Sequence, residues 1–180
     1  MEDMCVLMKK SSQAKYTTSY ENVAKAIKLN CTDKQQNIEQ LFSYIVFSCL
    51  VGNGDAHLKN FSVLYTQPNE DIFLSPLYDV VCTQPYPTTD NRLALSMNKS
   101  KEFPTYKGLL QFGKTIGLNK PEIIIEKMAD QMSSFIQQCD LWPNFPALKV
   151  AIQKTLSYGM SRSKGDDFNF DFKRVKKRKH

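Results

Sequence analysis

The residues with the greatest chemical potential lie together in one nine-residue segment, GNGDAHLKN at 52–60. This segment holds a carboxylate, an imidazole, an amine and two amides, a set that a loop does not need merely to join two elements. Its glycines allow the backbone to turn tightly and to approach a ligand closely. We therefore interpret the segment as a candidate catalytic loop.

The spacing of three oxygen-bearing residues indicates which chemistry the loop could support. Asp55 and Asn60 are five positions apart, the separation between the base and the metal-binding Asn of a protein-kinase catalytic loop. In such a loop the Asp accepts a proton from the attacking hydroxyl, while the Asn holds Mg²⁺ on the phosphates. Asp79, 19 residues beyond Asn60, supplies a second oxygen ligand of the kind that Mg²⁺ prefers. The pattern thus predicts Mg²⁺-dependent phosphoryl transfer.

Three other interpretations of these polar residues stay open. Asp55 and Asn53 could simply cap turns, with His57 a buried ring, because Asp and Asn are common turn formers. Asp55 and His57 could form a hydrolytic metal pair, although a third ligand at a standard spacing is missing. Residues 108–115, GLLQFGKT, fit the P-loop pattern, but no strand is predicted before them and their interior is apolar.

The elements around the loop are mostly helical. Thr32-Asp33 offers an N-cap, and apolar residues recur at helical spacing from there to Gly52-Asn53-Gly54, which ends the helix. Short strands are predicted at 61–65 and 72–74, and a further short strand at 93–97. Additional helices are predicted at 16–30, 106–116, 121–139 and 147–160. The fold class is therefore mainly α (α+β), with short β-hairpins at the candidate loop.

Composition places the chain among soluble globular proteins. Apolar residues make up 42% of the 180 residues, enough for a packed core. The longest apolar stretch, 44–51, is far shorter than the roughly 20 residues of a membrane span, and residues 1–15 lack the apolar core of a signal peptide. The five cysteines are widely spaced without a CxxC pair, which favours reduced thiols in the cytoplasm.

The positive charge is concentrated at the carboxyl end. Residues 173–180, KRVKKRKH, hold six of the 24 Lys and Arg and no acid, so the net charge of +6 belongs to this tail. We expect one domain over 1–163 and a basic, flexible tail over 164–180. A tail of this kind could bind nucleic acid through phosphate contacts, or could simply be solvated.

Several stretches resemble HipA-type serine/threonine kinases, the toxins of HipBA and HipBST modules. The strongest are GNGDAHLKNFSVLY at 52–65 and LSPLYDVV at 74–81. The start EDMC, with Lys15-Tyr16, is similar to the family's "EDFC…KYE" segment, and LALSMNK at 93–99 to its "LALSLNGK" strand. The resemblance covers about residues 2–160 and implies the C-terminal lobe of a protein-kinase-like fold.

The resemblance also implies roles for the site residues. Asp55 is similar to the catalytic base, and Asn60 and Asp79 to the Mg²⁺ ligands. His57, Lys59 and Tyr78 fall where the family contacts ATP and its phosphates. The expected activity is Mg²⁺-dependent transfer from ATP to a hydroxyl of a protein substrate, for which the family offers aminoacyl-tRNA synthetases as an example.

The family pattern also indicates partners. It implies a HipB-like, DNA-binding antitoxin, which would bring nucleic acid into the complex. In the family, a lobe with the phosphate-covering loop precedes the "EDFC" segment, whereas this chain begins at Met1-Glu2-Asp3. We therefore expect weak or no activity from the chain alone and a need for a complementary N-terminal lobe. The alternative is a non-catalytic lobe that binds an antitoxin, nucleic acid or another protein.

Overall fold

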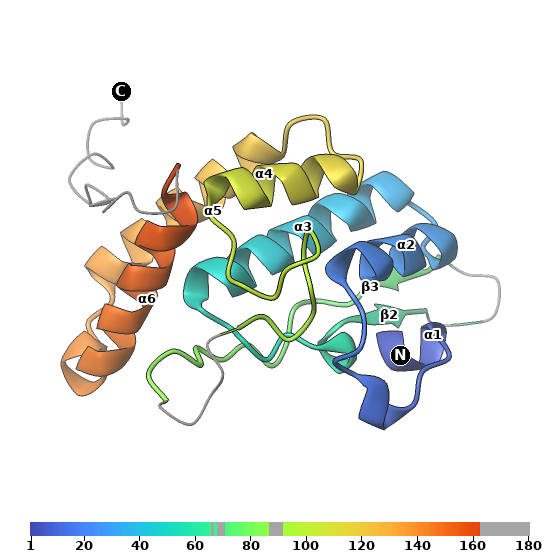
Figure 1. Cartoon of the computed structure of the whole chain (residues 1–180), viewed down its shortest axis with the longest axis horizontal. Coiled ribbons are helices and arrows are strands. Elements are labelled where there is room, and N and C mark those ends of the chain that lie inside the picture. The colour runs from blue at the N-terminus through green and yellow to red at the C-terminus, as the bar shows by residue number, and fades with distance from the viewer. Residues whose placement is uncertain (66, 68–70, 87–91, 163–180) are drawn as a thin grey trace.

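Helices dominate the computed structural model, which describes residues 1–65, 67, 71–86 and 92–162 (Figure 1). The predicted fold class, mainly α with short strands, is confirmed. The helices are α1 (Met4–Leu7), α2 (Tyr20–Asn30), α3 (Lys34–Val51), α4 (Tyr106–Thr115), α5 (Pro121–Gln138) and α6 (Pro146–Met160). The expected basic tail at 164–180 lies outside the described residues.

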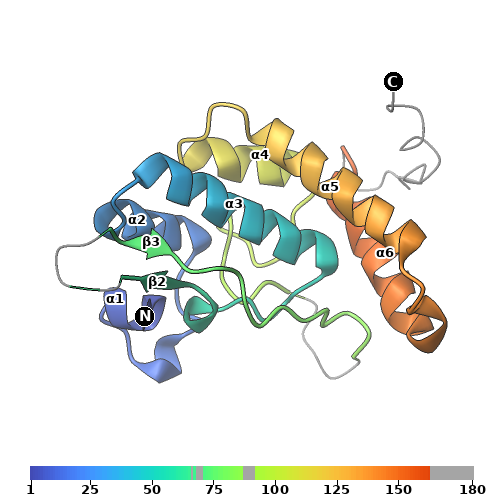
Figure 2. The ribbon, with the colours of Figure 1, turned by 180° about the vertical axis from the view of Figure 1, so that it is seen from behind.

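Helix α3 is the central element of the fold. It begins at the predicted N-cap, since Asp33 accepts a hydrogen bond from the backbone N–H of Gln36 at 2.9 Å. It crosses the middle of the molecule and packs against α2, α5 and α6 (Figures 1 and 2). The helix ends at Gly52, whose left-handed conformation, with φ of 80°, is readily adopted only by glycine. The predicted apolar stripe is buried throughout: Ile38, Leu41, Phe42, Ile45, Val46, Cys49 and Leu50.

A three-stranded antiparallel sheet lies beside the start of α3. Its order is β1 (Glu2–Asp3), β2 (Ser62–Leu64) and β3 (Phe73–Leu74), with Val63 paired to Glu2 on one side and to Leu74 on the other. The buried Asn37 of α3 accepts a hydrogen bond from the backbone N–H of Leu74 at 2.5 Å. The helix therefore anchors the strand from which the chain runs on to Asp79.

The alternative interpretation of residues 108–115 as a P-loop is excluded, because these residues lie within helix α4. At Gly113, helix α4 lies close to Pro121 of α5 and to Phe42 of α3. A Cβ atom built there would lie 2.4 Å from Cβ of Pro121 and 3.0 Å from the ring of Phe42. This glycine therefore permits helix packing and does not cradle a phosphate.

Helix α6 braces the end of α3. Thr155 donates a hydrogen bond to the backbone carbonyl of Leu50 at 2.7 Å. Gly159 allows the two helices to approach, since a Cβ there would lie 2.5 Å from Cδ2 of Leu50. Both views show α6 at the end of α3 from which the candidate loop departs (Figures 1 and 2).

Three sequence predictions differ from the structure. Residues 93–97 form only isolated bridges, Ser19 with Ser96 and Met97 with Ser100, because Asn98 and Lys99 adopt positive φ and fold the chain back. Strand β1 and helix α1 were not predicted, since two and four residues are too few to show a periodicity. Phe135 continues the apolar helical spacing that predicts the helix at 121–139, but it is 58% exposed and packs edge-on against Trp142.

Most of the cysteine side chains are buried. All five are free; Cys5, Cys31, Cys49 and Cys82 are buried, and Cys139 is partly exposed. In the part of the chain that the structure describes, no helix is both long enough and apolar enough to cross a membrane.

Candidate functional site

The predicted catalytic loop connects α3 to β2 and is held by Asn53 within the loop and by Thr83 outside it. After Gly52 the chain passes through a short 3₁₀ helix, Leu58–Asn60, before strand β2 begins. Asn53 accepts a hydrogen bond from the backbone N–H of Asp55 at 3.0 Å, so this buried amide does form the turn that the alternative interpretation expected. Thr83 accepts one from the N–H of Gly54 at 3.1 Å. These bonds fix the backbone from which the Asp55 carboxylate projects into solvent.

Asn60 and Asp79, the two predicted metal ligands, are in direct contact. The amide nitrogen Nδ2 of Asn60 donates to Oδ2 of Asp79 at 2.7 Å. Asn60 is buried and its Oδ1 accepts the backbone N–H of His57 at 2.9 Å, whereas Asp79 is exposed. Asp79 has a φ of 55°, uncommon for a residue other than glycine. The 18 residues between Asn60 and Asp79 therefore return the chain to the same point.

Two residues outside the loop contact its ionisable side chains. The hydroxyl of Tyr16 donates to Oδ1 of Asp55 at 2.9 Å. The ammonium Nζ of Lys15 lies 2.8 Å from Nε2 of His57, so this nitrogen accepts and the ring is neutral. Although Lys15-Tyr16 belongs to a segment that resembles the kinase family, sequence reasoning gave neither residue a role.

The electrostatic surroundings of His57 also favour the neutral ring. Burial lowers its pKa, and the positive charge of Lys15 lowers it further. The negative charges of Asp55 and Asp79 act in the opposite direction and raise the pKa of His57. Both carboxylates therefore interact electrostatically with the ring. The other ring nitrogen, Nδ1, is buried and has no hydrogen-bond partner among the described residues.

Tyr78 and Lys59 connect the loop to the segment before Asp79. The hydroxyl of Tyr78 lies 2.6 Å from Oγ of Ser62 and donates to the backbone carbonyl of Lys59 at 2.5 Å. Burial raises the pKa of Tyr78, so the phenol stays protonated. Because this hydroxyl is engaged within the protein, a contact with a nucleotide would use the ring. The partly exposed Lys59 side chain makes no hydrogen bond with the described residues.

The oxygen donors of Asn60 and Asp79 fit a magnesium ion that is shared with a nucleotide. Mg²⁺ is usually held by one or two carboxylates, waters and substrate phosphates, not by a cage made entirely of protein. Asn60 Oδ1 has a second lone pair beyond the one that accepts from His57. Within the described residues, no group of three or more His, Cys, Asp or Glu side chains could hold a metal. Since Nε2 of His57 is occupied by Lys15, the hydrolytic Asp55/His57 pair receives no support.

A cavity of about 630 Å³ opens beside Asp55 and is large enough for a small ligand or a peptide side chain. Its walls come from segments that are distant in sequence and include Tyr16, Gly54, Thr83, Ala94 and Lys101. The cavity therefore adjoins the predicted base.

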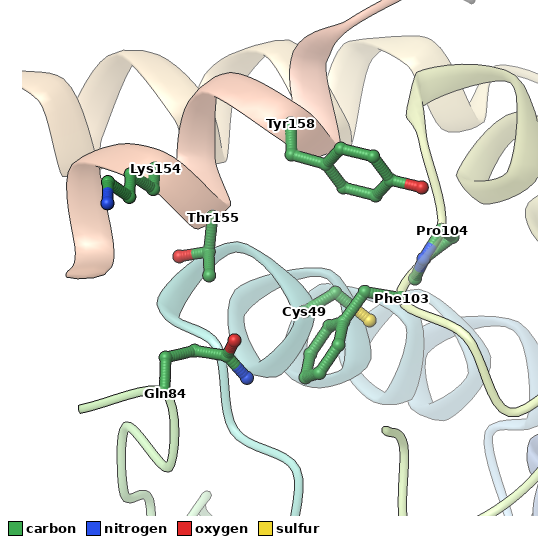
Figure 3. Close-up of a pocket in the computed structure, with 7 residues that line it drawn as sticks. All are labelled: Cys49, Gln84, Phe103, Pro104, Lys154, Thr155 and Tyr158. Atoms are coloured by element: carbon green, nitrogen blue, oxygen red, sulfur yellow. The ribbon is translucent and has the colours of Figure 1, made fainter. Parts of the chain in front are cut away.

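A smaller pocket, about 190 Å³, lies between α6 and the end of α3 (Figure 3). It is lined by Cys49, Gln84, Phe103, Pro104, Lys154, Thr155 and Tyr158. None of the predicted site residues lines it, so it is separate from the catalytic loop.

The fold has a counterpart among solved structures. The structure superimposes on HipA from a complex of Shewanella oneidensis MR-1 HipA, HipB and operator DNA, with a TM-score of 0.76. The match covers 87% of this chain and 42% of the HipA chain. The sequence identity of 18% makes this a likeness of fold. The family model described as HipA-like C-terminal domain matches residues 1–138. The chain belongs to the HipA-like C-terminal domain family.

Two proteins with similar sequences are named as putative kinases. A Haemophilus influenzae protein named "Putative kinase" is 33% identical over 130 residues, covering 63% of this chain and 37% of that protein. "Putative kinase Y4mE" of Sinorhizobium fredii is 26% identical over 126 residues, covering 67% of this chain and 30% of that protein. The chain therefore spans about a third of the length of these relatives.

Proposed function

We propose that this chain is the catalytic lobe of a HipA-like serine/threonine protein kinase, which uses Mg²⁺ and ATP to phosphorylate a protein hydroxyl. The observation that carries the proposal is the 2.7 Å contact between Asn60 and Asp79. It brings two oxygen-bearing side chains together beside the loop that presents Asp55. Family membership and the kinase names of the relatives support the same conclusion.

Each side chain has a distinct part in the proposed reaction. Asp55 accepts the proton of the acceptor hydroxyl while that oxygen bonds to the γ-phosphorus and the bond to the leaving ADP oxygen breaks. Asn60 and Asp79 would hold the Mg²⁺, and His57, Lys59 and Tyr78 would face the nucleotide. Bound Mg²⁺ and ATP would supply charge neutralisation and the transferred phosphoryl group.

The proposal includes a second lobe. Phosphoryl transfer by kinases also needs a loop over the phosphates and a strand lysine. The relatives are about three times longer than the regions that this chain matches, which leaves room for those parts elsewhere in them. We propose that a complementary N-terminal lobe completes the ATP site of this chain.

The partners are proposed from the family. The Shewanella oneidensis structure holds HipA with HipB and operator DNA, which supports a HipB-like antitoxin as partner and nucleic acid as part of the complex. The protein substrate would be a cytoplasmic component of translation such as an aminoacyl-tRNA synthetase, as the family resemblance implies. A lobe that only binds an antitoxin or nucleic acid remains the second candidate, since the same neighbour supports it.

Calorimetry of ATP binding with and without Mg²⁺ tests the metal site. The chain is measured with a co-expressed HipA-like N-terminal lobe, as wild type and as Asp79→Asn and Asp55→Asn. We expect Asp79→Asn to lose at least tenfold in Mg²⁺-dependent affinity and Asp55→Asn to bind nearly as wild type. Asp130→Asn, an exposed carboxylate on α5, is the matched control and should change nothing.

Transfer of labelled phosphate to dephosphorylated casein tests the base in the same variants. Asp55→Asn should reduce the rate by roughly 10²- to 10⁴-fold, the usual contribution of a general base. Wild-type protein that neither binds ATP nor transfers phosphate with the second lobe present would refute the proposal and favour the partner-binding candidate.

A further inference from the structure

Residues 15–16 form a strap over the catalytic loop. The backbone carbonyl of Lys15 accepts the N–H of Leu58 at 3.2 Å, which joins the two segments. The two side chains contact different residues of the loop. Nζ of Lys15 lies 2.8 Å from Nε2 of His57, and the hydroxyl of Tyr16 lies 2.9 Å from Oδ1 of Asp55. We call Lys15-Tyr16 the strap.

We propose that Tyr16 is a positioning residue for phosphoryl transfer, because it holds one carboxylate oxygen of Asp55 and leaves the other to the acceptor hydroxyl. This inference rests on the proposed function and adds a residue to it.

The Asp55 carboxylate has little else to hold it. Its backbone is fixed by Asn53, but the side chain is exposed, and Tyr16 is its only side-chain hydrogen-bond partner among the described residues. An exposed side chain of this kind samples several rotamers, and a base that points away from the acceptor does not react. The phenol therefore limits the orientations of the base.

Tyr16 itself is well anchored. Its ring meets the ring of His57 edge-on, with centroids 5.2 Å apart, and the Nζ atom of Lys15 lies 4.9 Å from its centroid. Burial raises the pKa of Tyr16, and the hydrogen bond to Asp55 raises it further, so the phenol remains a donor at neutral pH. Through these contacts His57 and Lys15 stabilise the group that orients Asp55.

The free oxygen of Asp55 has a place for an acceptor beside it. Oδ2 makes no hydrogen bond with the described residues, whereas Oδ1 is taken by Tyr16. Both side chains line the 630 Å³ cavity, which is wide enough for a hydroxyl-bearing side chain of a protein segment. Tyr16 thus holds the base at the edge of the space that an acceptor would enter.

The test compares Tyr16→Phe with wild type in the complex of the chain and its N-terminal lobe. We expect kcat for transfer to casein to fall about tenfold, since one hydrogen bond to a charged group is lost, with KM for ATP and for casein unchanged. Tyr106→Phe is the matched control, because it removes a similar bond, from Tyr106 to Glu126 at 3.1 Å, between α4 and α5. This control should retain wild-type kcat.

Each other outcome overturns the inference in a recognisable way. An unchanged kcat in Tyr16→Phe, with active wild type, would refute the positioning role and leave the proposed function intact. A raised KM for casein at constant kcat would make Tyr16 a binding residue. Equal losses in both Tyr→Phe variants would indicate a general effect on stability. Inactive wild type would refute the proposed function, and the role of Tyr16 with it.

Discussion

Replacement of Gly52 by Ala should destabilise the protein by about 3 kcal/mol. A residue with a Cβ atom in the left-handed conformation costs roughly 1–2 kcal/mol, and overpacking adds roughly 1–3 kcal/mol. The Cβ atom would lie 2.7 Å from Cγ of Gln84 and 2.9 Å from Cγ2 of Thr155. Thr155 cannot retreat without loss of its hydrogen bond to Leu50, whereas the longer Gln84 chain can shift.

Urea unfolding and thermal unfolding, each followed by far-UV circular dichroism, measure this change. At about 2–4 °C per kcal/mol for a chain of this size, the melting temperature should fall by roughly 6–12 °C. Gly108→Ala in helix α4 is the matched control, where the added Cβ would lie 3.0 Å from Cβ of Pro104. Helix propensity offsets that contact, so stability should change by less than about 1 kcal/mol. Equal stabilities of the two variants would refute the argument for a left-handed, crowded site at Gly52.

Two further predictions concern the N-terminus of α3 and the thiols. Asp33→Ala should reduce the free energy of unfolding by about 1 kcal/mol, because the backbone N–H of Gln36 loses the side-chain oxygen that caps the helix. An unchanged urea midpoint would contradict this prediction. A maleimide at pH 7.5 should label Cys139, which is partly exposed, before Cys49, because burial raises the pKa of Cys49 to about 12 and excludes the reagent. Mass spectrometry of tryptic peptides gives the order of labelling, and earlier modification of Cys49 would show that this part of the core opens readily.

The elements with strong local signals could be predicted from the sequence. Helix α3 has an N-cap, a continuous apolar stripe and a terminal glycine, and all three were found in the structure. Residues 93–97 have the composition of a strand, but neighbouring backbone in the fold offers them only single bridges. Strand β1 forms because β2 is available as a partner, a fact that two residues cannot encode locally.

Some residues of the candidate site could likewise be predicted from the sequence, whereas others could not. Asp55, Asn60 and Asp79 could be proposed because the chemistry of a kinase loop fixes their spacing, and the contact of Asn60 with Asp79 agrees with that proposal. Their catalytic roles stay predictions. The strap could not be found by spacing, since Tyr16 is 39 residues from Asp55 and Lys15 is 42 residues from His57. Such contacts depend on how the chain folds over itself.

The bracing of α3 by α6 involves a helix that lies beyond the residues matched by the family model. The family match ends at residue 138, whereas α6 spans Pro146–Met160. Yet Thr155 and Gly159 meet Leu50 only two residues before Gly52, where the catalytic loop begins. Sequence changes in α6 could therefore adjust the rigidity of the candidate loop from outside the residues that the family model matches, without altering any residue of the loop.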